Sequence, residues 1–244
     1  MLGIPANAPQ DGAQDPPPLR PLASYSGSLA HRTYLALREA IVSLRLGPGA
    51  PLKKGEICET LGVSRSPVSD AMARLAAEGL VQIIPQAGSF VSRFSMVEIR
   101  EAAFLREAIE LAAIEEIAPK MTEEQLVLLR RTLRVQEALV EDLDLPGFYA
   151  QDGEMHGLIL SFTGFPRLRQ VADTAWVQVN RARQLILPVP GRLNETLDEH
   201  RAILAALEAR DPVAARAAMR HHLRQLMKAL VPLERAYPDL FDPE

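Results

Sequence analysis

The strongest constraint on the fold is a pair of short helical segments separated by a single tight break. A helical pattern runs from about Lys54 to Leu61 and stops at Gly62-Val63, where glycine suits a sharp turn. The next helix is expected to begin at Ser64, a residue type that caps helix N-termini, and to end at Gly79. Two helices that flank a glycine turn indicate a helix-turn-helix.

A hairpin is predicted directly after these helices. Residues 80–84 and 89–91 are rich in β-branched and aromatic side chains, and residues 85–88 between them contain proline and glycine. A hairpin in this place corresponds to a wing beside the two helices. The unit is therefore expected to be a winged helix-turn-helix.

A longer helix is predicted before the motif, over residues 28–46, and Gly47-Pro48-Gly49 stops its pattern. Residues 1–24 contain six prolines among small and polar residues, a composition that neither continues a helix nor forms a core. We therefore expect a disordered arm over residues 1–24 and the winged unit over residues 25–94.

Beyond Arg93 the sequence shows helical patterns without strand alternation. The patterns are divided by segments rich in proline and glycine: Pro119-Lys120, Leu145-Pro146-Gly147, Gly164-Phe165-Pro166, Pro188-Val189-Pro190-Gly191 and Asp211-Pro212. These breaks predict about six helices in an antiparallel bundle over residues 97–232, followed by a tail over 233–244. The fold class is thus mainly α, a winged helix-turn-helix plus an all-α helical bundle.

Charge is distributed unevenly along the chain. The net charge is −4, yet residues 25–95 contain eight Lys or Arg against five Asp or Glu. This weak positive balance in the N-terminal third is compatible with a nucleic-acid partner. No apolar run approaches the roughly 18 to 20 residues that cross a bilayer, and no secretion signal begins the sequence, so we expect a cytoplasmic protein without a membrane partner.

The run Gly62-Val63-Ser64-Arg65-Ser66-Pro67-Val68, with Glu78-Gly79-Leu80-Val81 and Gly88-Ser89-Phe90-Val91 after it, resembles the winged helix of the GntR superfamily. The resemblance covers residues 28–94 almost without gaps. It implies a transcriptional regulator, a repressor or an activator, that binds a palindromic double-stranded DNA operator as a homodimer.

DNA contacts are expected from the start of the second and third helices and from the wing. The residues are Lys53, Lys54, Ser64, Arg65, Ser66, Val68, Ser69, Arg74 and Gly88. Hydroxyls and backbone N–H groups at a helix N-terminus suit phosphates, and Arg65 can reach a guanine edge or a phosphate. The alternative is that Arg65 and Arg74 are ordinary solvated charges. The family usually has Arg-Glu where Ser69-Asp70 stands, so one DNA-reaching arginine is missing.

Four residues in the C-terminal part form a candidate metal site. Asp152 and His156 are four residues apart and share a helix face with apolar side chains. His200 lies on the apolar face of the next-to-last helix, and His222, unlike its neighbour His221, does so on the last. One divalent cation would satisfy all four inward groups, whereas each histidine alone could equally be a hydrogen-bonded core residue.

The runs Asp152-Gly153-Glu154-Met155-His156, residues 199–211 and Ala218-Met219-Arg220-His221-His222-Leu223 look like the FCD ligand-binding domain of the FadR-like GntR subgroup. The resemblance implies one divalent ion per chain, Zn²⁺, Ni²⁺, Mn²⁺ or Fe²⁺, and a small organic acid as effector. It also matches Arg106 to an arginine that binds the effector carboxylate. An ion pair between Arg106 and Glu110, four residues on, explains this arginine equally well.

The function predicted from the sequence is a DNA-binding regulator whose operator binding is modulated by an organic acid at the metal site. One alternative is a regulator that responds to the metal itself, with a structural or sensing role for the ion. A metal-dependent hydrolase fits less well, because the Asp-His₃ set has no obvious second acid or base and the DNA-binding unit would be unexplained. The chain is therefore predicted not to be an enzyme.

Overall fold

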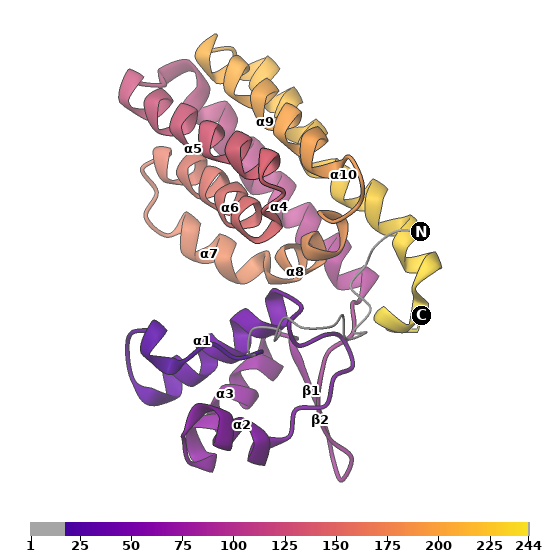
Figure 1. Ribbon diagram of the computed structural model, residues 1–244. Helices are drawn as coiled ribbons and strands as arrows, with labels where there is room; N and C mark the ends of the chain where they lie inside the picture. Colours follow the sequence, from indigo (N-terminus) through magenta and orange to yellow (C-terminus); the bar gives the residue numbers. More distant parts are fainter. Residues whose placement is uncertain (1–17, 244) are drawn as a thin grey trace. The chain divides into compact units, whose positions relative to one another are not determined.

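The computed structural model describes residues 18–243, so most of the proline-rich arm expected over residues 1–24 lies outside the described part of the chain. The expectation of disorder is wrong for the last residues of that arm, because Leu22–Ser24 form a 3-10 turn (η1) and Leu19 is buried. The described chain divides into two compact units, one of residues 18–96 with 236–243 and the other of residues 97–235 (Figure 1).

Three helices form the body of the N-terminal unit: α1 (Leu29–Val42), α2 (Lys54–Leu61) and α3 (Arg65–Ala77). The hydroxyl of Ser28 caps α1, and Gly62 ends α2 in the left-handed conformation with a φ of 64°. A side chain with a Cβ is strained at that angle, so the glycine fixes the turn that brings α3 against α2. The helix-turn-helix predicted from the sequence is confirmed.

The hairpin is also confirmed. β1 (Val81–Ile84) and β2 (Gly88–Val91) pair antiparallel, with the first residue of β1 opposite the last residue of β2. The segment before α2 lies along the other edge of β2, where the amide of Leu52 donates to the carbonyl of Ser89 at 2.7 Å. The wing is thus fixed at its base by a third piece of chain.

The end of the chain belongs to the N-terminal unit. The amide of Phe94 donates to the carbonyl of Leu240, and the amide of Asp242 donates to the carbonyl of Phe94, both at 2.9 Å. Phe241 is buried, and its ring centroid lies 5.6 Å from that of Phe94. The tail expected over residues 233–244 is therefore wrong for residues 233–243, because α10 continues to Ala236, Pro238–Leu240 form a 3-10 turn and Phe241 forms a bridge with Phe94.

The C-terminal unit is an all-α bundle. Its helices are α4 (Met96–Ile117), α5 (Glu123–Glu141), α6 (Leu145–Phe162), α7 (Leu168–Ala175), α8 (Val177–Ile186), α9 (Arg192–Glu208) and α10 (Pro212–Ala236). The described residues thus contain seven helices here, where about six were expected. The extra boundary falls at Trp176, between α7 and α8, where neither proline nor glycine marks the break.

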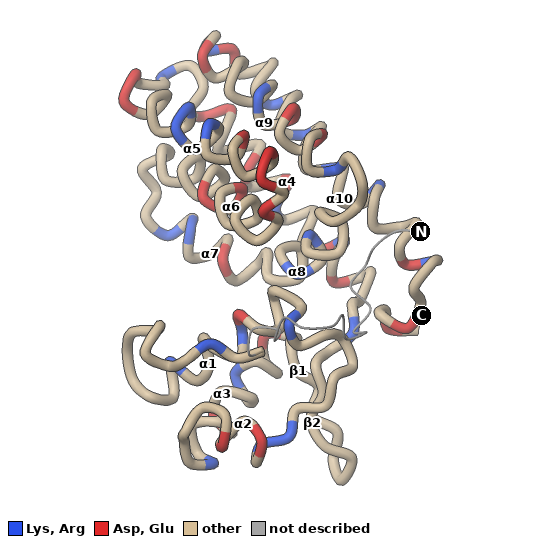
Figure 2. Tube along the Cα trace, in the orientation of Figure 1, with Lys and Arg blue, Asp and Glu red and all other residues tan. Residues whose placement is uncertain are grey.

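Helix α5 packs against both α6 and α9, and its N-terminus carries a reciprocal capping box between Thr122 and Gln125. The apolar core of the bundle includes the fully buried Phe148 and Ile203. Acidic and basic residues are interspersed along these helices (Figure 2). Among the described residues, no helix is both long and apolar enough to cross a membrane.

Candidate functional site

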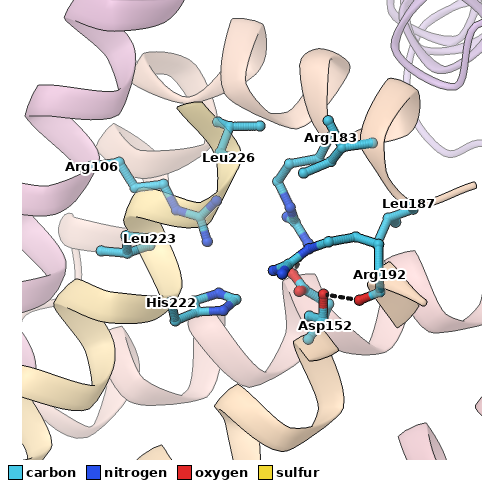
Figure 3. A pocket seen from close by; sticks show the side chains of 10 residues that line it. Arg106, Asp152, Arg183, Leu187, Arg192, His222, Leu223 and Leu226 are labelled. Carbon is cyan, nitrogen blue, oxygen red and sulfur yellow. Dashed lines mark hydrogen bonds and ion pairs between the residues drawn. The ribbon is translucent and has the colours of Figure 1, made fainter. Parts of the chain in front are cut away.

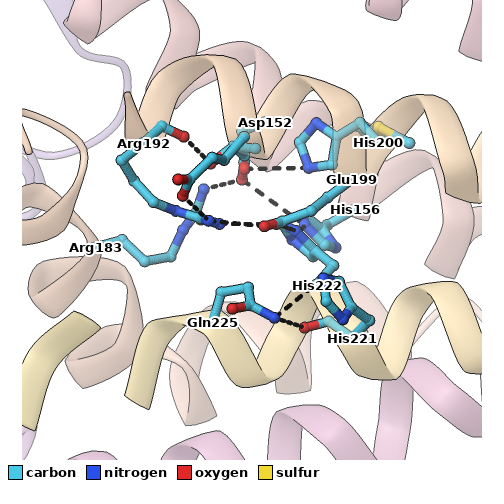
Figure 4. A network of polar contacts seen from close by, with 12 residues as sticks. Asp152, His156, Arg183, Arg192, Glu199, His200, His221, His222 and Gln225 are labelled. Carbon is cyan, nitrogen blue, oxygen red and sulfur yellow. Dashed lines mark hydrogen bonds and ion pairs between the residues drawn. The ribbon is translucent and has the colours of Figure 1, made fainter. Parts of the chain in front are cut away.

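The four predicted metal ligands meet in the interior of the C-terminal unit. Asp152 and His156 come from α6, His200 from α9 and His222 from α10, and all four are buried. One ligand atom from each lies within 4.8 Å of the others (Figure 4). The Nε2 atoms of His156 and His222 are 3.1 Å apart, a spacing suited to two donors that face one cation.

Each of the three histidines is held from behind through its Nδ1 atom. The partner of His156 is a carboxylate oxygen of Glu110, that of His200 is Oε1 of Gln136 at 2.7 Å, and that of His222 is Oε2 of Glu199 at 2.7 Å. An Nδ1–H that donates to an oxygen leaves Nε2 with a free lone pair. All three rings therefore present Nε2 to the space beside Asp152.

The sequence did not single out these three partners as part of the site. Gln136 could have been found, because it lies three residues after Leu133 and four before Val140, and all three are buried on one face of α5. A polar amide in such a row requires a buried partner. Glu110 entered the sequence argument only as a partner of Arg106, and the adjacency of Glu199 to His200 is too common a pattern to be informative.

The electrostatics of the cluster favour neutral His200 and His222 beside an ionised Asp152. Burial and the neighbouring histidines lower the pKa of His200 well below its ordinary range, and burial also lowers the pKa of His222. Burial opposes ionisation of Asp152, but Arg183 and the histidines outweigh it and hold the pKa of this carboxyl below its usual range. Neutral imidazoles and a carboxylate are the protonation states that bind a divalent cation.

The cluster also contains buried polar atoms without a hydrogen bond, as expected of atoms that bind a cation. Within the described residues, Oδ1 of Asp152 and Nε2 of His200 take part in no hydrogen bond, while Oδ2 of Asp152 forms an ion pair with Arg183. Buried polar atoms rarely lack a hydrogen bond, and a shared metal ion would bind Asp152 and His200 together. The residues present therefore fit a divalent ion with imidazole and carboxylate ligands. His221 is exposed on the outer face of α10, as its helical position predicted.

Two cavities lie beside the cluster. Their volumes, which include the space at their openings, are about 330 and about 410 Å³. Arg106 and Arg183 line both, and Arg192 lines the first (Figure 3). Arg106 also forms the ion pair with Glu110 that the sequence left open, with Nε 2.5 Å from Oε1. It is thus both a cavity wall and the support of the carboxylate that holds His156.

In the N-terminal unit the predicted DNA contacts separate into two groups. Ser64, the N-cap of α3, is exposed together with Arg65 and Ser66, and so are Lys53 and Lys54 at the start of α2. The ammonium of Lys54 also donates to Ser69, at 3.2 Å, and Gly88 is exposed at the start of β2. These positions are accessible to a partner, although the ammonium of Lys53 also pairs with Glu56 at 2.8 Å.

The other group faces the protein. Val68 is completely buried on the inner face of α3, together with the core residues Met72 and Leu75. Its prediction as a DNA contact is therefore wrong. The guanidinium of Arg74 lies 3.6 Å from the ring centroid of Tyr34 and its Nε 3.4 Å from Glu78, which supports the structural alternative for this arginine.

Comparison with known proteins agrees with both units. Residues 29–91 match the bacterial regulatory proteins, gntR family, and residues 101–225 match the FCD domain. An HTH-type transcriptional regulator in an unstable DNA locus of Streptomyces ambofaciens is 35% identical over 85% of this chain and 87% of its own length. The HTH-type transcriptional repressor RspR of Escherichia coli (strain K12) is 32% identical over 86% of this chain and 92% of its own.

The fold has a counterpart among solved structures. The Escherichia coli protein McbR/YncC superposes with a TM-score of 0.73, over 85% of this chain and 99% of that protein, at 22% identity. The mainly α fold predicted from the sequence, a winged helix-turn-helix plus an all-α bundle, is thereby confirmed. The chain belongs to the GntR family of bacterial regulatory proteins, with an FCD domain as its C-terminal unit, and is a DNA-binding transcriptional regulator rather than an enzyme.

Proposed function

We propose that this regulator binds a palindromic operator as a homodimer, in the cytoplasm, and that a small organic acid at a divalent metal site modulates the binding. The metal ligands are Asp152, His156, His200 and His222, with one Zn²⁺, Ni²⁺, Mn²⁺ or Fe²⁺ per chain. The main support for the metal site is that each histidine is fixed through Nδ1 by a separate acceptor. This leaves three Nε2 atoms directed at one carboxylate.

The DNA-binding face is the N-terminal end of α3 with the start of α2. Arg65 would reach a base edge or a phosphate, while Ser64, Ser66 and Ser69 would meet phosphates at the helix N-terminus. Lys53 and Lys54 add sequence-independent attraction, and Gly88 lets the wing approach the backbone. The Escherichia coli relative is named a repressor, so we propose repression rather than activation.

The effector site is the pair of cavities beside the metal ligands, with Arg106 in the wall of each. The metal would supply a positive centre for an acid, and Arg106 would orient the acid while it keeps Glu110 in place. A second candidate is a regulator that responds to the metal alone, and the buried cluster by itself is equally compatible with it.

Fluorescence anisotropy with DNA that flanks the gene separates these functions. The full chain is titrated with the labelled DNA after metal removal, after reloading with Zn²⁺, and after reloading with organic acids present at constant Zn²⁺. A change in operator affinity with an acid supports the proposal. A change with Zn²⁺ and none with any acid supports the metal-responsive regulator, and equal affinity for operator and random DNA overturns both.

A further inference from the structure

Arg183 lies where it would compete with a cation for the carboxylate of Asp152. Its guanidinium, on α8, forms an ion pair with Oδ2 of Asp152, the one carboxylate among the four candidate ligands. The Nε2 of His156 lies 3.8 Å from the same Oδ2 atom. Arg183 is itself buried and lines both cavities. A divalent cation bound by this cluster would share Asp152 with Arg183 or displace it.

The charges next to the four candidate ligands are balanced without a metal, and Arg169 and Asp173 add one charge of each sign to the lining of the second cavity. Three guanidinium–carboxylate pairs are present: Arg106 with Glu110, Arg183 with Asp152, and Arg192 with Glu199 through two contacts of 2.7 Å. Arg181, also on α8, lines neither cavity. A divalent ion adds two positive charges to this balanced set. Uncompensated charge is costly inside a protein, so the filled site favours a ligand with two negative charges.

The three arginines are not equivalent once a cation is bound. Glu110 and Glu199 hold His156 and His222 from behind and are not ligands, so Arg106 and Arg192 keep their partners. Arg183 alone among these three is paired with a ligand carboxylate. It is therefore the guanidinium that becomes available when the cation takes Asp152.

We propose that Arg183 is a counter-ion switch, which neutralises Asp152 in the metal-free protein and binds a small dicarboxylate in the metal-loaded protein. This inference rests on the proposed function and names the class of effector. Because coupling between two ligands is reciprocal, the metal raises the affinity for the dicarboxylate and the dicarboxylate raises the affinity for the metal.

The test uses isothermal titration of the full chain with Zn²⁺ alone, and then of the Zn²⁺-loaded protein with matched acids. Malonate and succinate are compared with propionate and butyrate, which have equal lengths and one carboxylate fewer. We expect the dicarboxylates to bind about tenfold more tightly, since hydrogen bonds to charged groups are the strong ones. Arg183→Met should remove that preference and yet raise the affinity for Zn²⁺, by about threefold or more, because a competitor for Asp152 is gone.

Arg201→Met is the matched control, since Arg201, on α9, is exposed, pairs with Glu137 and lines neither cavity. It should change neither affinity. Should Arg183→Met fail to fold, Arg183→Lys should keep the parental affinity for Zn²⁺ and weaken the dicarboxylate preference, because an ammonium lacks the fork of a guanidinium.

Opposite changes in the two affinities are the signature of the switch, since a merely structural arginine would weaken both. Loss of both affinities in Arg183→Met, equal binding of mono- and dicarboxylates, or binding of no acid by a Zn²⁺-loaded parent overturns the inference. Absence of stoichiometric Zn²⁺ from the parent protein instead means that the proposed function itself has failed.

Discussion

In the N-terminal unit, the side chains proposed to meet a ligand, such as Arg65 and Ser66, are exposed and take no part in the core. In the C-terminal unit the corresponding groups, such as Asp152 and His200, are completely buried, and each depends on other buried groups. Function and stability are thus separable in the first unit and coupled in the second. A surface substitution should weaken DNA binding in a stable protein, whereas a substitution in the buried cluster should change both properties.

The sharpest test of this coupling is His222→Ala, with His221→Ala as its neighbour on the same helix. Loss of a buried ligand should abolish stoichiometric metal and lower the melting temperature, because an ion bound only by the folded state stabilises that state. Elemental analysis and calorimetry of the purified variants measure both effects. The exposed His221 should be replaceable without either change, and equal metal content in the two variants would refute the assignment by helix face.

The next effect concerns the acceptors behind the histidines. Glu199→Gln should lower metal affinity by about 10- to 100-fold, the usual effect of removing an outer partner of a ligating histidine. Glu195→Gln is the control, since Glu195 pairs with the same arginine, Arg192, but is exposed, whereas Glu199 is the carboxylate bonded to Nδ1 of His222. Competition with a chromophoric chelator reports both affinities. Equal affinities in the two variants would mean that Nδ1 of His222 needs no carboxylate.

For the surface unit, Arg65→Ala should reduce operator affinity by about 1 to 3 kcal/mol if the side chain reads a base, and should lower discrimination against random DNA. The melting temperature should stay at the parental value, because this side chain is exposed and outside the core. Anisotropy titrations at several salt concentrations separate base reading from phosphate contact. A large drop in stability would break the distinction between the two units.

The smallest effect is expected from a polar group of the N-terminal unit that faces inward. The hydroxyl of Tyr34 donates to Glu78 at 2.6 Å, and burial together with this bond raises the pKa of Tyr34 to about 12. A phenol whose pKa is higher in the folded state stabilises the fold below its unfolded pKa of 10, and this contribution is lost as pH rises towards about 12.

Tyr34→Phe should therefore lower the free energy of unfolding by about 1 kcal/mol at pH 8 and flatten its decline between pH 10 and 12. Urea unfolding at several pH values measures both quantities. An unchanged slope in the variant would assign the alkaline loss to other groups, such as Tyr25, whose pKa is raised to about 12 in the same way.

The fold was predictable where local chemistry decides it. Gly62 has the left-handed conformation that its type favours, and the four-residue spacing of Asp152 and His156 places both on one helix face. The packing of Val68 into the core was missed because a position near a helix N-terminus suggests exposure, while its direction depends on which face meets α1 and α2.

Long-range partners were beyond a reading of the sequence. Gln136 and His200 are 64 residues apart, and Phe94 and Phe241 are further apart still. The sequence around one residue of each pair therefore does not indicate its partner. The role of Arg183 was missed for the same reason, since α8 has no metal-ligating residue to draw attention to it. Charge pairs of this kind follow from the packing of helices and not from their periodicity.

Within residues 18–243, the polypeptide passes between the two units twice, between Met96 and Val97 and again between Arg235 and Ala236. Each tether continues a helix that reaches the buried cluster: α4 contains Glu110, and α10 contains His222. A small rotation of either helix would therefore be transmitted to the winged unit through covalent bonds alone.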